Sequence, residues 1–342
     1  LNFVIINRYF CGGKVKSILA FLQFNIVFLR RPAPPDAPFT GLPNFRTMEI
    51  LLYSRPRATH DGGELGRLLE ALDRHGFRVC MNRELAEATA ALTGIRIPES
   101  KQYASLKEAC PDARMLICYG GDGTFLDGVR MLDDRSIPVL GINSGRLGFL
   151  ANVPREGIDR ALEDIREGHY SIESRPLLRA EGDFPEGAAP AHAFNEFSLQ
   201  RSGASMIAVE AYVNDEMVAT YWGDGVLLST PSGSTAYSLS VGGPVVAPGC
   251  DCLVLSPIAP HNLTMRPVVV PGGSLLTFRV STREERALAT LDNRNYPVRN
   301  GATFRVSKSK NSVFLVRLQN ISFYDTLRNK MMWGFDRRDE TK

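Results

Sequence analysis

The sequence lacks the short motifs that identify several large classes of enzyme. It contains neither a Gly-x-Gly-x-x-Gly run nor a glycine-rich loop ending in Gly-Lys-Ser/Thr, so neither the Rossmann fingerprint nor the Walker type of phosphate loop applies. Its five histidines show no metal spacing such as His-Glu-x-x-His, which argues against a zinc enzyme. No repeat of fixed period is visible.

Cysteine pairs with the Cys-x-x-Cys spacing are also missing. None of the six cysteines belongs to a Cys-x-x-Cys pair, and Cys118 stands inside an apolar run. Scattered, partly buried thiols fit a reducing, cytoplasmic location better than a disulfide framework. The six are Cys11, Cys80, Cys110, Cys118, Cys250 and Cys252.

The body of the chain has no excess of positive charge. The net charge of +3 arises in residues 1–47, which hold six basic side chains against Asp36, whereas the remaining 295 residues sum to −2. Without a basic stripe, nucleic acid is not expected as the main partner. The length of 342 residues, with 44% apolar and 23% charged residues, is typical of a soluble globular protein of two domains.

The first 47 residues differ in character from the rest. Their apolar stretch, 18–29, is interrupted by polar residues and is shorter than the ~20 residues that span a bilayer, so no membrane partner is expected. It resembles a signal-peptide core, but Arg30-Arg31 stands where a small-residue cleavage site belongs, and a proline-rich linker follows. We expect the working protein to begin near Met48. Residues 1–47 are then a mis-assigned start, which we favour, or an accessory anchor outside the fold.

Strands and helices alternate over residues 48–155. Leucines at helical spacing indicate one helix that ends at Gly76, and Thr124 is well placed to cap another. Such alternation predicts an N-terminal α/β domain whose parallel sheet is covered on both faces and binds ligands at the carboxyl ends of its strands. The expected strands are 49–54, 77–81, 115–119 and 138–141, and the expected helices are 64–75, 82–110 and 124–132.

Residues 156–320 have a different pattern. After an expected helix at 157–168, short β-rich runs dominate, separated by polar or glycine turns. This spacing predicts a second, mostly β domain. The expected strands are 193–199, 207–213, 217–221, 226–229, 253–255, 274–280, 287–291 and 303–306.

A glycine turn follows the strand expected at 115–119. It reads Gly120-Gly-Asp-Gly-Thr124. Glycines directly after a buried strand let the backbone approach a ligand and point N–H groups at it, and phosphate is the usual guest. Asp122 would repel phosphate, so its presence suggests metal binding or removal of a proton. The turn therefore predicts a phosphoryl-transfer site with its own base, with a plain tight turn as the alternative.

A second dense motif lies at 223–248. Seven serine and threonine side chains crowd around glycines there, beside Asp224, Tyr237 and three prolines. Hydroxyls and backbone N–H groups can grip a polyhydroxylated ligand, and Tyr237 can stack on a base or ring. A serine-rich surface loop is the alternative.

Taken together, the motifs from Met48 to Trp333 resemble the NAD kinase family in its bacterial form. Gly-Gly-Asp-Gly alone is shared with lipid kinases of the diacylglycerol type and, loosely, with phosphofructokinases. The run Thr-Pro-Ser-Gly-Ser-Thr-Ala-Tyr, with Asn-Glu upstream, is far more specific. The matching blocks are Gly120–Thr124, Gly141–Leu150, Asn195-Glu196, Asp224–Pro248 and Phe323–Trp333.

The resemblance implies a fold and a reaction. The fold is an α/β nucleotide domain followed by a β-rich domain, with the active site in the cleft between them and residues 321–338 packing back on the first domain. The reaction transfers the terminal phosphoryl of ATP to the 2′-hydroxyl of the adenosine ribose of NAD, giving NADP and ADP. Asp122 matches the family's general base, and Mg²⁺ is expected to be carried mainly by nucleotide phosphates, without metal ligands from the chain.

The resemblance also assigns binding residues. Residues of the glycine turn would hold phosphates: Gly120, Gly121, Gly123 and Thr124. The loop holding Asn143 and Arg146 would shape the cleft floor or serve structure alone. The family further implies partners NAD and ATP and a homo-oligomer, either a dimer or a tetramer. The residues that would bind NAD are Gly123, Asn195, Glu196, Ser205, Asp224, Thr235, Ala236, Tyr237, Ser238, Leu239, Ser240 and Arg294.

Three positions depart from the family pattern. Many relatives carry a basic residue where this chain has Asp127, and an arginine often stands at the position of Trp222. Asp292-Asn293-Arg294 replaces a common Asp-Gly-Gln. These departures leave open the choice of phosphate donor, whether ATP, another triphosphate or polyphosphate, and the surroundings of Asp224.

Two other functions compete with this interpretation. A diacylglycerol- or sphingosine-type lipid kinase shares the glycine turn but has no reason to keep Asn195-Glu196 and the hydroxyl-rich block. A non-catalytic dinucleotide sensor would keep the fold, yet gains nothing from a carboxylate beside phosphates. Asp122 therefore favours an enzyme.

Overall fold

A computed structural model of the chain describes residues 48–55, 62–104, 110–132, 135–145, 147–187, 191–319 and 321–334. Residues 45–342 form one compact unit. The expected N-terminal extension, 1–47, lies outside the described residues, as do Arg146 and residues 335–338 of the expected C-terminal segment.

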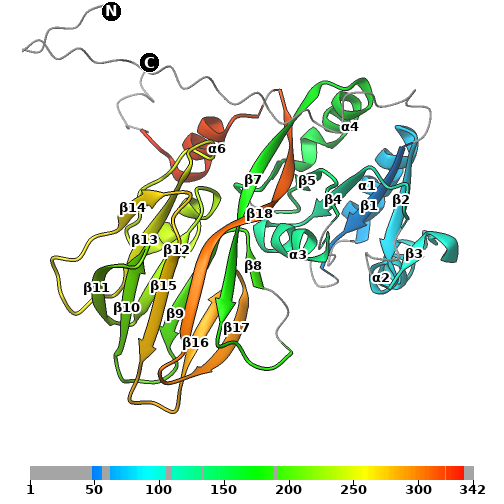
Figure 1. The fold of residues 1–342 in the computed structure, drawn as a ribbon. Helices are drawn as coiled ribbons and strands as arrows, with labels where there is room; N and C mark the ends of the chain where they lie inside the picture. Colours follow the sequence, from blue (N-terminus) through cyan, green and yellow to red (C-terminus); the bar gives the residue numbers. More distant parts are fainter. Residues whose placement is uncertain are drawn as a thin grey trace, which may run out of the picture. The chain divides into compact units, whose positions relative to one another are not determined.

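The first half of the unit is a parallel sheet with helices on both faces (Figure 1). Its strands run in the order β5-β4-β1-β2-β3, and all pair in parallel. Alternation along β1 explains the two layers: Ile50 and Leu52 face one helical core, whereas Leu51 faces the other. This confirms the α/β prediction. The elements are β1 (Met48–Tyr53), α1 (Gly62–Arg74), β2 (Phe77–Asn82), α2 (Arg83–Thr93), η2 (Glu99–Lys101), β3 (Gln102–Tyr103), β4 (Met115–Tyr119), α3 (Asp122–Leu132), β5 (Val139–Ile142) and β6 (Ala151–Val153).

Helix α4 (Ile158–Glu167), which follows η3 (Arg155–Gly157), belongs with this first core. Its apolar face contributes Ala161, Leu162 and Ile165 to the cluster that also holds α1 and β1. The domain boundary expected from the sequence lies between residues 155 and 156. Helix α4 follows this boundary but packs on the first core.

The second half is built from two antiparallel sheets packed face to face. One continues the first sheet through β18, β15, β10 and β11, with β7 and β8 alongside, and the other has the order β14-β13-β12-β9-β16-β17. Both sheets supply the same core, in which Phe197 contacts Phe278 and Phe304. This confirms the β-rich prediction. The bounds are β7 (Tyr170–Gly182), β8 (Ala191–Ala193), β9 (Glu196–Arg201), β10 (Ile207–Val213), β11 (Glu216–Gly223), β12 (Gly225–Ser229), η4 (Ser232–Thr235), α5 (Tyr237–Ser240), β13 (Cys252–Ile258), β14 (Val268–Pro271), β15 (Leu276–Ser281), β16 (Arg286–Leu291) and β17 (Arg294–Arg299).

Strand β18 (Thr303–Leu318) links the two halves (Figure 1). Its start pairs with β15, its full length with β7, and Leu315 pairs in parallel with Val139 of β5. The chain then returns to the first half as α6 (Phe323–Met331), which begins with a capping box of Ser322 and Asp325. Ile321 packs on the first core.

Several expected elements have different limits. The segment 82–110 is helical only to Thr93, and α3 begins at Asp122, so Thr124 lies inside the helix rather than capping it. Strand β18 continues twelve residues beyond the expected 303–306, because the polar run Ser307–Asn311 hides its strand character. Strand β7 was missed since Pro176 and charged side chains interrupt its apolar pattern.

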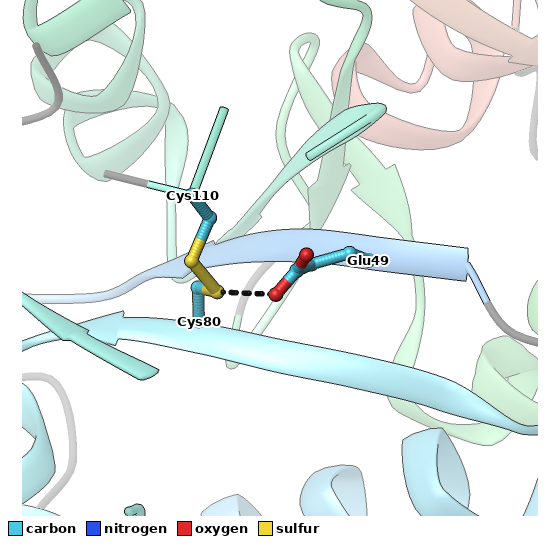
Figure 2. A group of neighbouring side chains, drawn as sticks. All are labelled: Glu49, Cys80 and Cys110. Atoms are coloured by element: carbon cyan, nitrogen blue, oxygen red, sulfur yellow. Dashed lines mark hydrogen bonds between the residues drawn. A yellow bond between two sulfur atoms is a disulfide. The ribbon is translucent and has the colours of Figure 1, made fainter. Parts of the chain in front are cut away.

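The cysteine expectation is wrong for one pair. Cys80 of β2 and Cys110 form a disulfide, with Glu49 of β1 beside them (Figure 2). Among the described cysteines, Cys118, Cys250 and Cys252 remain free. The argument for a cytoplasmic location from scattered thiols therefore loses its basis. Within the described ranges, no helix combines the length and apolar content needed to cross a bilayer.

Candidate active site

The glycine turn connects β4 to α3 at the carboxyl end of the parallel sheet, as expected. Strand β4 is buried along its whole length, and Gly120 N–H donates to the Ile142 carbonyl of β5. Gly120 has φ +154°, and a Cβ there would lie 2.4 Å from Thr124 Oγ1, so only glycine fits. Helix α3 then begins at once, which aims its N-terminal N–H groups at the space above the turn.

The carboxylate of Asp122 is held by the loop that follows β5. Oδ1 accepts from the N–H groups of Leu150 and Ala151, at 2.9 and 3.0 Å, and Oδ2 accepts from Phe149 N–H at 3.0 Å. A Cβ on Gly148 would lie 2.0 Å from Oδ1, so a glycine there is what allows this approach. The loop of the Gly141–Leu150 block therefore orients the Asp122 carboxylate, a role that was not expected from the sequence.

The second oxygen of Asp122 is the more open of the two. Oδ2 has one N–H donor, and Lys330 Nζ of α6 lies 3.5 Å away. The Lys330 ammonium also sits 4.8 Å from the ring centroid of Phe149, whose N–H binds the same oxygen. The Asp122 side chain is 30% exposed, so solvent or a substrate can reach it.

Asn195 and Glu196 form a second polar cluster, at the start of β9. Both residues are buried, at 6% and 8% exposure. Asp292, in the β16–β17 turn, accepts the backbone N–H groups of Phe194, Asn195 and Glu196 and thereby fixes this strand end. Asn195 Oδ1 and Glu196 Oε2 are buried without a hydrogen-bond partner. Buried acceptors without a partner on these two consecutive residues indicate a candidate binding position for a polar ligand.

The environment of Glu196 favours its neutral form. Burial, and then the nearby charge of Asp292, raise the pKa of the Glu196 carboxyl to about 8. Burial likewise raises the pKa of Asp292, against its three backbone donors. At neutral pH, Glu196 can therefore donate a hydrogen bond as well as accept one.

The hydroxyl-rich block divides into a buried half and an open half. The side chains of Ser229, Thr230, Ser232, Ser234 and Ser238 are buried. Thr230 Oγ1 donates to the Phe194 carbonyl, and a Cβ on Gly233 would lie 2.2 Å from the Asn195 carbonyl, so this half packs directly on the Asn195–Glu196 strand. The open half, which can face a ligand, consists of Thr235, Ala236, Tyr237, Leu239 and Ser240.

Two contacts and one pocket join these elements. Phe125 of α3 packs against Phe194 with ring centroids 5.9 Å apart. A small pocket is lined by Phe149 and Leu150, which bind Asp122, and by Ser232 and Thr235 of the hydroxyl-rich block. The structure thus brings the blocks around Asp122, Asn195 and Thr235 together between the two halves.

The second contact involves two of the departures from the family pattern. Asn293 Nδ2 donates to Asp127 Oδ1 at 2.9 Å, and Arg55 Nε donates to Asp127 Oδ2 at 2.6 Å. Burial raises the pKa of Asp127, but the hydrogen bonds from Arg55 and Asn293 outweigh it and leave the pKa lowered. Arg55 also donates to the Gly123 carbonyl, so a cation lies against the glycine turn. In the sequence, Asp127 and Asn293 stood out only as separate departures, and Arg55 did not stand out. Asn293 and Arg55 lie 166 and 72 residues from Asp127, so no local pattern links the three.

The remaining predicted residues lie around the second half. Asp224 forms an ion pair with Arg201 at 2.6 Å, and burial, with the charges of Asp224 and Glu196, raises the pKa of Tyr237. Ser205 N–H donates to Glu284 at 3.3 Å. Arg294 binds the His192 carbonyl. These contacts occupy the polar atoms of Asp224 and Arg294, so a ligand would have to share them.

The described residues contain one group of side chains with metal-ligand spacing, Glu49, Cys80 and Cys110. Both sulfurs belong to the disulfide (Figure 2), so neither is a thiolate ligand in this state. Lys101 pairs with Glu49. This group therefore does not act as a metal centre while the disulfide stands.

Comparison with known proteins gives consistent results. Residues 64–170 match the model of the ATP-NAD kinase N-terminal domain, and residues 194–318 match that of the C-terminal domain. The chain is 38% identical over 295 residues to a protein named NAD kinase from Flavobacterium psychrophilum, covering 85% of this chain and all of the relative. It is 40% identical over 293 residues to another from Cytophaga hutchinsonii, with the same coverage.

Solved structures agree in fold. A crystal structure of an NAD kinase from Archaeoglobus fulgidus in complex with ATP matches with a TM-score of 0.65 and 26% identity, covering 83% of this chain and 99% of that one. The crystal structure of yeast NADH kinase complexed with NADH matches with a TM-score of 0.73 and 20% identity, covering 85% and 89%. The second likeness concerns the fold alone.

Proposed function

The chain belongs to the ATP-NAD kinase family and is a phosphotransferase, and from this premise we propose that its reaction takes place between Asp122 and the Asn195–Glu196 pair. There the terminal phosphoryl of ATP passes to the 2′-hydroxyl of the adenosine ribose of NAD. The products are NADP and ADP. The two curated relatives named above, which this chain covers in full, support the choice of substrate.

The observation that carries the proposal is the orientation of Asp122. Its Oδ1 accepts two backbone N–H groups, whereas Oδ2 accepts one and retains accepting capacity, and the side chain is partly exposed. A carboxylate fixed in this way can orient a sugar hydroxyl and accept its proton without reorganising. The ribose oxygen then forms a bond to phosphorus, the bond from phosphorus to the bridging oxygen breaks, and ADP leaves with that electron pair.

The Asn195–Glu196 pair is proposed to hold the ribose. Its two unpartnered oxygens gain hydrogen bonds when a ribose edge enters. Neutral Glu196 can donate to one ribose oxygen while Asn195 accepts from a hydroxyl. The open half of the hydroxyl-rich block, with Ser205, Asp224 and Arg294 further out, would hold the remaining parts of NAD.

Phosphate binding is proposed at Gly120, Gly121, Gly123 and Thr124. Gly120 N–H and Thr124 N–H already donate to the carbonyls of Ile142 and Gly121, so the backbone donors offered to phosphate would be those of Gly121 and Gly123. The guanidinium of Arg55 adds positive charge there. A divalent cation, Mg²⁺ in the proposal, would be held mostly by phosphates and water. The nearby carboxylates fit that arrangement, because Asp122 and Asp127 already bind donors of the chain. When bound, the ion would neutralise phosphate charge.

One assay tests the proposal and one variant tests the base. The purified full chain with NAD, ATP and Mg²⁺ should form NADP, read by a coupled NADP-dependent dehydrogenase. Asp122→Asn should lower kcat by about 10³-fold or more, since the proton acceptor is lost, while NAD still binds. The control is Asp215→Asn, an exposed aspartate in the β10–β11 turn. If Asp122→Asn stayed within about tenfold of the parent, worth only ~1.4 kcal/mol of barrier, the base assignment would be wrong.

The same preparation separates the rival functions. Phosphate transfer to a diacylglycerol or sphingoid base, with none to NAD, would indicate a lipid kinase. NAD binding without turnover under all donors would indicate a sensor. Replacing ATP by another triphosphate or by polyphosphate identifies the donor.

A homo-oligomer and a cytoplasmic location remain proposals that rest on the family resemblance. Light scattering of the purified chain distinguishes monomer, dimer and tetramer, and cell fractionation reports the location.

A further inference from the structure

Helix α6 brings a cation to the proposed base from the far end of the sequence. Asp122 and Lys330 are 208 residues apart, yet Lys330 Nζ lies 3.5 Å from Asp122 Oδ2. We propose that Lys330 is a catalytic residue that contacts the transferring phosphoryl group. The inference rests on the proposed function.

The position of Lys330 is fixed by packing and not by the ion pair alone. The side chains of Thr326 and Leu327 are buried, and Phe323 packs against Phe149 with ring centroids 6.2 Å apart. The capping box at Ser322 sets the start of the helix. This short, packed helix of nine residues therefore holds residue 330 beside the loop that binds Asp122.

Two local interactions also stabilise the ammonium of Lys330 at this position. It lies 4.8 Å from the ring centroid of Phe149, where the negative ring face attracts a cation. Residue 330 is in the last turn of α6, where the helix dipole also favours positive charge. Together these contacts place a cation beside the one oxygen of Asp122 that is open to substrate.

The chemistry at that oxygen needs such a charge. The ribose hydroxyl must meet Oδ2 and the phosphorus together, so the phosphoryl oxygens pass close to the same point. Lysine has three N–H donors on a flexible stem and can bond Oδ2 and a phosphoryl oxygen at once. When Oδ2 accepts the proton, the carboxylate loses its negative charge. The ammonium then interacts electrostatically mainly with the phosphoryl oxygens. Lys330 thus acts more strongly in the transition state than in the resting site.

Lys330→Met tests this role in the full chain with NAD, ATP and Mg²⁺. Methionine keeps the length, the helix propensity and the contact with Phe149, so only the charge is lost. We expect kcat to fall about 10- to 100-fold while KM for NAD changes by less than about twofold. Lys330→Arg should recover most of the lost kcat. The matched control is Arg328→Met, because Arg328 is exposed on the same helix and pairs with Asp325.

Each other outcome counts against the proposal. A Lys330→Met enzyme with kcat within about threefold of the parent overturns it. A low kcat with a lowered melting temperature and no recovery in Lys330→Arg assigns Lys330 a structural role and overturns it too. If the parent makes no NADP at all, the proposed function fails along with this inference, whereas an active parent with an equally active Lys330→Met loses only the inference.

Discussion

Asp122 and Glu196, one in each half of the molecule, place two carboxyl groups in opposite environments. Asp122 belongs to the α/β half, is 30% exposed, and accepts three backbone N–H bonds with a lysine near its free oxygen. Glu196 belongs to the β-rich half, is 8% exposed, and has one oxygen buried without a partner. Backbone donors hold and orient a carboxylate, whereas burial without a hydrogen-bond partner favours the protonated form of Glu196. The two halves thus contribute different chemistry from the same functional group.

The largest effect on the free energy of unfolding is expected for a cysteine substitution in the α/β half, compared with one in the β-rich half. Removing the cross-link with Cys110→Ser frees a loop of 30 residues and should lower the free energy of unfolding by ~3–4 kcal/mol. Cys250→Ser in the β-rich half is the control, because that thiol is free and exposed. Chemical denaturation without reductant measures both. With dithiothreitol present, the difference between Cys110→Ser and the parent should vanish, and a persistent gap would point to packing instead of the cross-link.

Glu196 should make stability depend on pH. Its pKa is about 8 in the folded chain against an ordinary 4.5, so the folded state binds more protons between these values. The stabilising effect is complete below pH 4.5 and is lost as the pH rises through 8, by ~3 kcal/mol between pH 5 and pH 8. Glu196→Gln should reduce this slope in unfolding experiments at the two pH values. Asp292, whose pKa is also raised, adds a slope of the same sign.

Exposed Glu216→Gln is the control for this measurement, and it should keep the full slope. A parent protein whose stability does not change over this range would contradict the neutral state of Glu196 and with it the contrast to Asp122.

Displacing the Asp122 carboxylate without changing it should slow the reaction less than removing it. A Cβ at Gly148 would lie 2.0 Å from Asp122 Oδ1, so Gly148→Ala must move the carboxylate or the loop. We expect kcat to fall about 10- to 100-fold, because a misplaced base loses alignment. At Gly145, in the same loop, a Cβ would meet open space, and Gly145→Ala should retain activity. Equal rates for the two variants would show that the geometry of the loop does not matter.

The smallest effect is expected at the contact that joins the halves. Asn293→Ala removes one hydrogen bond to Asp127, whose other oxygen stays bound to Arg55. The free energy of unfolding should fall by ~1 kcal/mol. Asn295→Ala changes an exposed amide whose contact stays within the β16–β17 hairpin, and it serves as the control. Faster amide exchange in α3 for Asn293→Ala, but not for Asn295→Ala, would locate the effect at the junction.

The fold class followed from the sequence because apolar periodicity reports burial directly. The strand at Met115–Tyr119 and the helix around Leu65–Leu72 are examples. Strand β18 was cut short at its polar stretch, since its hydrogen bonds come from partners such as β7 that local periodicity does not report. The Cys80–Cys110 bridge was missed for a related reason: spacing alone does not tell which cysteines meet.

The candidate site divides in the same way. Asp122, Asn195 and Glu196 stood out by motif and family resemblance. Arg55, Lys330 and the role of Asp292 did not, because each acts through a contact between segments distant in sequence. A single arginine after a strand or a lysine in a last helical turn gives no local signal. Such partners become visible only when the tertiary structure places them.

Strand β18 has a consequence for any attempt to divide the gene. The segments matching the two family domains end at residue 170 and resume at 194, which invites a cut between them. A fragment ending there would lose Leu315 as the neighbour of Val139, so that β6, which pairs with Gly141 and Ile142, would cover only the second half of the apolar strand β5. Unpaired apolar borders recruit strands from other molecules. The upstream fragment made alone should therefore precipitate, and co-expression of both pieces should restore its solubility.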